Sequence, residues 1–209
     1  METSQQPTTH RRRRRRLVGL LLVVAAAATI GAASFSLAIF TSTQAVGANA
    51  FTTGTIVLGV APATAILTSS TMMPGDSVPT GAPGQAVTVS NPGTAALRYA
   101  ISGVSTDTDN KHLNTQLLIT VRQPDGNAGS SCALMTGNSL FSAVVPTAGL
   151  NMVGDPAPGG QAGDRTLAAG SSETLCFKAS LPLATTNAYQ GASSTYTFTF
   201  AAEQTANNP

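Results

Sequence analysis

Short stretches of alternating hydrophobic and polar residues follow one another along most of the chain. In the last stretch Tyr196, Phe198 and Phe200 alternate with threonines, so an extended backbone would place the aromatic rings on one face and the hydroxyls on the other. Such alternation, in residue types that suit a pleated surface, is typical of a half-buried β-strand. Clusters of Gly, Pro, Asn and Asp separate the stretches and favour turns.

This pattern predicts about eight short strands and no amphipathic helix after residue 40. The expected strands cover residues 51–60, 63–68, 85–90, 96–104, 115–123, 140–145, 174–183 and 194–203. Residues 146–171, rich in Gly, Pro and Ala, are weakly patterned, and we expect a long surface excursion there. Tyr189-Gln190-Gly191 is expected to turn the chain into the last strand, whose aromatics would pack between two sheets. The sequence therefore predicts an all-β, jelly-roll-like antiparallel β-sandwich.

The first forty residues are different in kind. Residues 11–16 are six consecutive arginines, and no charged residue occurs from 17 to 40. A basic segment, an apolar helix and then small residues form the layout of a secretory signal, with the expected cut between Ala38 and Ile39. The alternative is an uncleaved membrane anchor, because 24 uncharged residues could span a bilayer. Both interpretations place the rest of the chain outside the cytoplasm, secreted or at the cell surface.

The predicted organisation has four parts, of which one is a folded domain. These are a signal peptide or anchor (1–38), an extended tail (39–50), a β-sandwich domain (51–205) and a loose C-terminus (206–209). Without residues 1–38, five Lys and Arg face eight Asp and Glu, so the exported part carries a formal charge of −3. The absence of a basic patch excludes nucleic acid as an expected partner. Only residues 17–40 are expected to contact a membrane.

The two cysteines, Cys132 and Cys176, both lie in the exported part. An exported pair is most simply a disulfide, and closing a loop of this length would stabilise the fold by about 4 kcal/mol. Metal thiolates or a nucleophilic cysteine would need further partners, and the exported part has a single histidine, His112.

Catalytic and metal motifs are absent from the sequence. It has no H-E-x-x-H or G-x-S-x-G motif, and a catalytic triad would depend wholly on His112, in an expected loop. Asp107 and Asp109 could offer oxygen ligands to calcium, but the glycine and the bidentate glutamate of an EF-hand loop are missing. A polar turn is the preferred interpretation of both residues, as it is of Asp76. We therefore expect no enzyme, no cofactor and no metal site.

Four segments in order resemble the TasA and camelysin family of secreted proteins, whose export depends on a SipW-type signal peptidase. The resemblance depends on four features in order. The first two are an F-x-x-G-T segment after the cut and a P-G-D followed by N-x-G-T. The last two are a hydrophobic strand, LNTQLLITV, and a closing Y-Q-G with an aromatic strand and A-x-Q. The matching residues are Phe51, Gly54, Thr55, Pro74, Gly75, Asp76, Asn91, Gly93, Thr94, Tyr189, Gln190, Gly191, Phe198, Phe200, Ala202 and Gln204. The similarity spans most of residues 31–205 and is thinnest across 125–172.

The resemblance implies a jelly-roll domain and a structural role, since TasA assembles into the extracellular matrix fibres of biofilms. Camelysin-like members are described as surface metalloendopeptidases, but the sequence offers no zinc site to carry that activity. The six-arginine signal and the cysteine pair also depart from the family pattern. The expected partners are copies of the same chain, other matrix or surface proteins, and the signal peptidase during export.

These expectations lead to one mechanism and one alternative. After cleavage the tail could lend a strand to the edge of another subunit, with Ile39, Phe40 and Val46 filling pockets, and build a filament. The tail could instead be a linker, or the first strand of its own sheet. The alternative function is a monomeric adhesion or binding module displayed on a membrane anchor.

Overall fold

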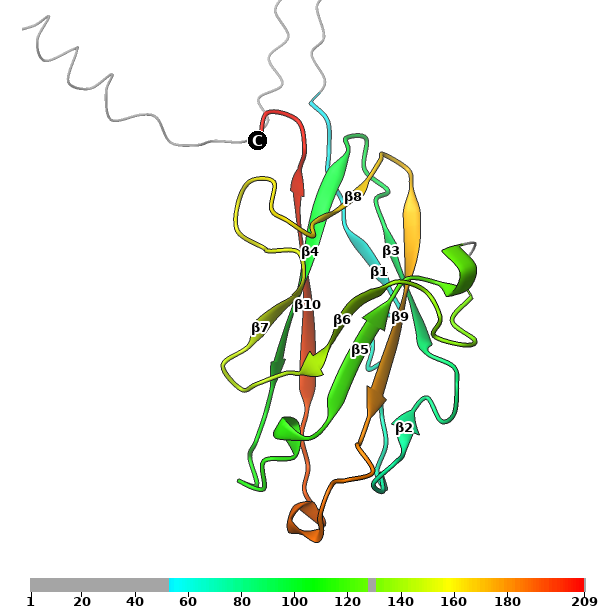
Figure 1. Cartoon of the computed structure of the whole chain (residues 1–209). Coiled ribbons are helices and arrows are strands. Elements are labelled where there is room, and N and C mark those ends of the chain that lie inside the picture. The colour runs from blue at the N-terminus through cyan, green and yellow to red at the C-terminus, as the bar shows by residue number, and fades with distance from the viewer. Residues whose placement is uncertain (1–52, 128–130, 209) are drawn as a thin grey trace, which may run out of the picture. The chain divides into compact units, whose positions relative to one another are not determined.

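The computed structural model describes residues 53–127 and 131–208, and these residues form two facing antiparallel β-sheets with no α-helix (Figure 1). One sheet has the order β1-β3-β9-β5-β6, with β2 also beside β9, and the other has the order β10-β4-β7, with β8 also beside β4. The strands of the first sheet are β1 (Gly59–Ala61), β2 (Ser77–Val78), β3 (Gln85–Ser90), β5 (Leu118–Arg122), β6 (Ser139–Val144) and β9 (Ser172–Ser180). Those of the second are β4 (Leu97–Ser105), β7 (Leu150–Val153), β8 (Arg165–Leu167) and β10 (Tyr196–Gln204). The predicted all-β sandwich is confirmed.

The chain passes between the sheets at most of its connections. It crosses from β3 to β4, back to β5, over to β7 after the β5–β6 hairpin, back to β9 after β8, and over to β10. Repeated crossing of this kind gives the winding that a jelly-roll-like fold implies. Three single 3-10 turns lie in the connections: η1 (Leu113–Thr115), η2 (Asp125–Asn127) and η3 (Asn187–Tyr189).

The core lies between the two sheets and is built by alternating residues. Val87 and Val89 of β3, Ile119 and Val121 of β5, and Phe177 of β9 are all at most 1% exposed. Their spacing of two is the one that the sequence pattern predicts for strands with a single buried face. From the other sheet β4 adds Leu97, Tyr99 and Ile101, which are equally buried.

Two of the predicted strands are wrong in extent or existence. The strand expected over 51–60 is reduced to β1, because Thr55 bonds instead to the β3–β4 turn, accepting from the N–H groups of Thr94 and Ala95 at 2.9 and 3.1 Å. Residues 63–68 form no strand. Partly buried hydrophobic residues in both segments still pack against the core, so packing without strand pairing produced the apolar pattern.

The surface excursion expected over 146–171 is also wrong. This segment contributes β7 and β8, which lie along successive parts of β4, and it buries Met152, Val153 and Leu167. β4 is nine residues long, and two short strands share one side of it. Strands of three and four residues in a Gly- and Pro-rich segment are too short to establish an alternating pattern.

Asn208, near the C-terminus, forms hydrogen bonds with side chains of β4 and β10. Arg98 donates from Nη2 to the carbonyl oxygen of Asn208, and Asn208 donates from Nδ2 to Glu203 at 2.8 Å. A nearby polar group, Asn91, is fully buried and donates to three carbonyl oxygens, those of Ala95, Leu167 and Ala168. It thereby joins the β3–β4 turn to the end of β8.

No helix among residues 53–127 and 131–208 is long and apolar enough to cross a membrane. The predicted signal helix lies in residues 1–52, outside the described residues.

Candidate functional site

The most distinctive feature of the described residues is the open edge of β10. This strand ends its sheet, with β4 on one side and no described strand on the other (Figure 1). It pairs with β4 over nine residues without a register shift, from Tyr196 opposite Ser105 to Gln204 opposite Leu97. An edge strand of this length presents a row of backbone groups that another strand can pair with.

Two hydrogen bonds that flank β10 establish which of its backbone groups are free. Thr195 accepts from the N–H of Thr106 at 2.9 Å, and the N–H of Thr205 donates to Ala96 at 3.3 Å. In an antiparallel pair, residues bonded to the neighbour alternate with residues whose N–H and C=O point away from it. The odd-numbered residues of β10 therefore bond to β4, and the even-numbered residues direct their backbone groups to the open edge.

The same even-numbered residues direct their side chains into the sandwich. The rings of Phe198 and Phe200 lie 5.4 and 6.4 Å from that of Phe177 in the opposite sheet, and Phe200 lies 6.4 Å from Tyr99. The prediction that the three aromatics of this strand pack between the sheets is confirmed. They remain half-buried, whereas Phe177 and Tyr99 are fully buried, so the core is incompletely covered along this edge.

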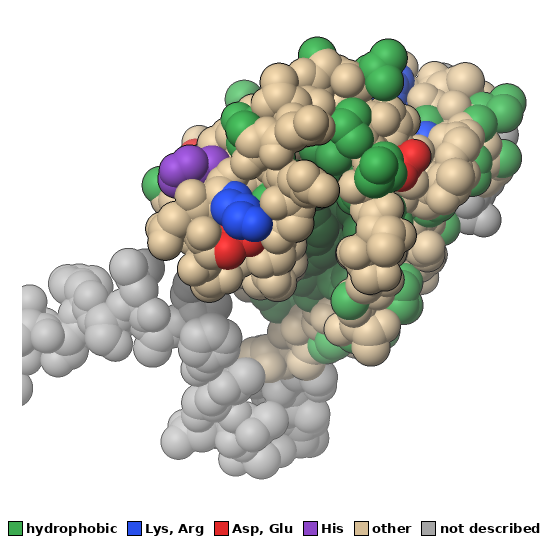
Figure 2. Space-filling model, turned by 90° about the horizontal axis from the view of Figure 1, so that it is seen from below, with side chains coloured by type: hydrophobic (Ala, Val, Ile, Leu, Met, Phe, Trp, Pro, Cys, Tyr) green, Lys and Arg blue, Asp and Glu red, His purple; other side chains and the backbone are tan. Residues whose placement is uncertain are grey.

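The opposite sheet extends beyond β10. Because β10 packs on Phe177 of β9, the strands β3 and β1 continue past the point at which the sheet of β10 ends. Figure 2 shows the domain from below the view of Figure 1, where a hollow lined by hydrophobic side chains opens. A further strand beside β10 would extend its sheet over this overhang and cover the half-buried rings.

Polar contacts hold the chain where it enters β10. The carboxylate of Asp109 accepts from the N–H and the hydroxyl of Ser193 at 2.6 and 3.1 Å, and Lys111 donates from Nζ to the carbonyl oxygen of Gln190 at 3.0 Å. The backbone N–H groups of Lys111 and Ser193 hold the pKa of Asp109 below its ordinary value. These contacts fasten the loop after β4 to the turn before β10.

His112 and the acidic loop residues take structural roles. Asp107 accepts from the backbone N–H of His112 at 2.8 Å and from its ring Nδ1, and Asp76 accepts from the N–H of Met73 at 2.8 Å. The preferred interpretation of Asp76, Asp107 and Asp109 as turn residues is therefore confirmed. Within 53–127 and 131–208, no three His, Cys, Asp or Glu side chains are grouped as a metal ion requires.

At its other end β10 is fastened by Glu203. Partial burial acts to raise the pKa of Glu203. Hydrogen bonds from Arg98, Asn208 and the N–H of Gly159 outweigh burial and hold this pKa below its ordinary value. A second polar group joins the two sheets nearby, where Tyr99 donates to Glu173 at 2.7 Å and Arg165 donates to the same carboxylate. Burial and the bond to Glu173 raise the pKa of Tyr99.

A small cavity of about 170 Å³ lies between this end of β10 and the β7–β8 connection. Its lining consists of Arg98, Tyr99, Asp155, Pro156, Ala157, Asp164, Ala201, Ala202 and Glu203. Asp164 accepts from the N–H groups of Asp155 and Gln161 at 3.0 and 2.8 Å, so its carboxylate shapes the loop. Ligand pockets usually enclose about 300–1,000 Å³. This cavity is too small to suggest a substrate site.

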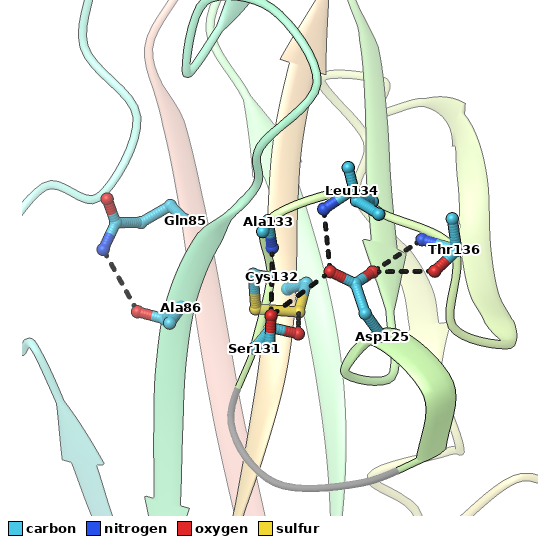
Figure 3. The surroundings of a disulfide bond; sticks show 9 residues. Gln85, Ala86, Asp125, Ser131, Cys132, Ala133, Leu134 and Thr136 are labelled. Atoms are coloured by element: carbon cyan, nitrogen blue, oxygen red, sulfur yellow. Dashed lines mark hydrogen bonds between the residues drawn. A yellow bond between two sulfur atoms is a disulfide. The ribbon is translucent and has the colours of Figure 1, made fainter.

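The predicted disulfide between Cys132 and Cys176 is formed, with a Cα–Cα distance of 5.4 Å (Figure 3). It ties the β5–β6 connection to β9, and the carbonyl oxygen of Cys132 also accepts from the N–H of Gly84 at 2.7 Å. Asp125 organises the same connection, because its carboxylate accepts from the N–H groups of Leu134 and Thr136, both at 2.7 Å. Those two N–H groups hold the pKa of Asp125 below its ordinary value.

The remaining predicted site residues lie outside the described part of the chain. These are the cleavage residues Ala38 and Ile39 and the proposed donor residues Ile39, Phe40 and Val46. The sequence analysis did not identify β10 as an open edge, nor Asn91 and Asp125 as hydrogen-bonding centres. An alternating strand looks the same in sequence at an edge and in the middle of a sheet, so no local signal identified the edge.

Comparison with known proteins adds no relative. The sequence matches no model of a known protein family, and it matches none of the curated proteins. The resemblance to the TasA and camelysin family therefore stays a prediction that depends on the four segments.

Proposed function

We propose that this protein is a structural subunit of extracellular fibres, similar to TasA, and that the open edge of β10 accepts a strand from another subunit. The observation that carries the proposal is the combination found on β10. Its even-numbered residues direct to the edge backbone groups that no described strand pairs with, and half-buried apolar side chains lie beside them. Strand addition uses these two features, because main-chain hydrogen bonds supply affinity and alternating side chains fill pockets.

The proposed donor is the tail of a second copy, residues 39–50. No charged residue occurs from 17 to 75, so this tail brings no charge that pairing would have to desolvate. Phe40 and Val46 are six residues apart and would fall on one face of an extended strand, with Ile39 on the other face. Phe40 and Val46 are thus the residues that would extend the core.

Such a contact joins different surfaces on the two subunits, so it propagates as a filament. The signal would hold assembly off until export, because the tail is joined to the apolar segment before cleavage. A disulfide in the domain is consistent with an oxidising, extracellular location.

The test compares purified residues 39–209 with residues 51–209, both oxidised and incubated at high concentration. The first is expected to form filaments visible by negative-stain microscopy and to sediment, and the second is expected to stay monomeric. Two double variants of residues 39–209 test the side chains at constant tail length. Phe40→Ser with Val46→Ser should abolish assembly. The control, Thr41→Ser with Thr43→Ser, should assemble like the wild type.

Identical behaviour of the two lengths would contradict the donated strand. Monomers in both samples would favour the alternative function, an anchored surface module, and the N-terminal residue of the exported protein would then show whether the signal is retained.

A further inference from the structure

Four of the seven exposed large hydrophobic side chains among the described residues lie at the two ends of the domain. We define the entry end as residues 54–57, 91–96, 168–171 and 205–208, which surround the place where the described chain begins. None of these residues is Asp, Glu, Lys or Arg. Ile56 and Val57 are 40% and 47% exposed here. The entry end is thus an uncharged surface with two accessible aliphatic side chains.

We define the far end as residues 72–76 and 181–186, which lie where β9 ends (Figure 1). It carries the two most exposed large hydrophobic side chains of the described residues, Leu183 at 81% and Met73 at 67%. Asp76 is the only charged residue of these two segments, and its carboxylate accepts from the N–H of Met73.

Both far-end side chains stand on loops that are fastened together. The N–H of Gly75 donates to Leu181 at 2.8 Å, and the N–H of Leu181 donates to Asp76 at 2.9 Å. A backbone that hydrogen bonds already order lowers the entropy cost of a contact made through its side chains. The far end therefore presents Met73 and Leu183 in a fixed arrangement.

The direction of β10 determines which end of one subunit would lie beside which end of the next in a filament. β10 runs from the far end to the entry end, since Tyr196 follows the β9–β10 connection and Gln204 pairs with Leu97 at the start of β4. All strand pairs in the domain are antiparallel. A donor strand antiparallel to β10 would finish at the far end of the acceptor and continue at once into the entry end of its own subunit.

The length of the tail brings these two surfaces together. If nine residues of the tail pair with β10, at most about six remain before Gly54, which is about 20 Å of extended chain. We propose, resting on the function proposed above, that Ile56 and Val57 of one copy pack on Met73 and Leu183 of the next. The contact buries apolar side chains, and the one carboxylate of the far end, that of Asp76, already accepts from the N–H of Met73.

The test uses residues 39–209 with one charge added at a time. Leu183→Glu and Met73→Glu are each expected to raise the critical concentration for filament formation about tenfold, as for a central apolar anchor. Leu134→Glu is the matched control, because Leu134 is 63% exposed on the β5–β6 connection, away from both end surfaces. It should assemble like the wild type, and far-UV circular dichroism should confirm that all three variants fold.

A second measurement reports the contact directly. Val57→Cys combined with Leu183→Cys should form disulfide-linked ladders in filaments, and Val57→Cys combined with Leu134→Cys should not. If filaments form through the tail but the two far-end variants assemble like Leu134→Glu and no ladder appears, the end contact is wrong and the donated strand stands. If no sample forms tail-dependent filaments, the proposed function is wrong and the end contact fails with it.

Discussion

The strands β10 and β6 each end a sheet, but only one of them is a good template for another strand. β10 keeps one register along nine residues. β6 has six residues and pairs with β5 through a register shift between Val121 and Arg122. Short length and bulges are devices that protect an edge from unwanted pairing. The comparison teaches that β6 carries such protection and β10 does not, which is why we place assembly on β10.

The largest difference between the two edges should be in the unfolding free energy that is lost when a core side chain packed against each edge strand is removed. Phe177→Ala removes the fully buried ring on which Phe198 and Phe200 pack, and it should cost about 3–5 kcal/mol of unfolding free energy. Phe141→Ala, in the half-buried face of β6, should cost less, about 1–3 kcal/mol. Urea unfolding measures both. Equal losses would mean that β6 has as much core behind it as β10.

Loss of the disulfide should weaken the β6 side and leave the β10 edge usable. Cys132→Ser with Cys176→Ala frees the connection that leads into β6, and about 2–4 kcal/mol of stability should be lost. Assembly of residues 39–209 should continue under conditions in which the variant remains folded. Thermal unfolding and sedimentation check the two halves of this prediction, and a folded variant that fails to assemble would link the disulfide to the β10 edge.

Single proline substitutions at two adjacent residues can test which backbone N–H groups of β10 face β4 and which face the open edge. Ala201→Pro removes an N–H that bonds to β4, and the fold should lose about 1–3 kcal/mol because the acceptor is left unpaired. Ala202→Pro removes an N–H that points to the open edge, where proline is tolerated. It should retain most of the stability and lower assembly. The opposite order of stabilities would reverse the assignment of the free groups.

The smallest effect is expected from pH at the start of β10. The pKa of Asp109 is lowered in the folded state, so the unfolded chain takes up this proton more readily. The contribution of Asp109 is therefore present above the unfolded pKa, near 4, and is lost as the pH falls through the folded pKa. Asp109→Asn should reduce the loss of stability on acidification below about pH 4, measured by thermal melts. An unchanged pH profile would show that the bond to Ser193 does not matter for folding.

The sequence predicted the fold where strands are long and alternate. Residues 85–90 coincide with β3, and the aromatic alternation of 196–200 placed the rings of β10 correctly. β7 and β8 were missed because three or four residues cannot show a period. Residues 63–68 were misjudged because Ile66 and Leu67 pack against the core without strand pairing. Alternation reports which face of a strand is buried, and it carries no information on what lies beside the strand.

The candidate site was predictable only in part for the same reason. Cys132 and Cys176 were paired correctly because two cysteines in a part of the chain that is predicted to be exported leave few alternatives. The open edge of β10 depends on the order of strands in the sheet, which long-range pairing decides. The role of Asn91 depends on carbonyl groups more than seventy residues away in the sequence, so its local context as a turn residue predicts nothing of its burial.

The unbroken pairing of β10 with β4 also has a mechanical consequence. In a filament joined by donated strands, tension would pass along β10 parallel to its axis. All nine residue pairs between β10 and β4 would then be loaded at once in shear. They would not open one after another from an end. Contacts at both ends of β10, through Asp109 and Glu203, would further oppose such sliding. If the proposed fibres form, a subunit built in this way would transmit pulling force along them without unfolding.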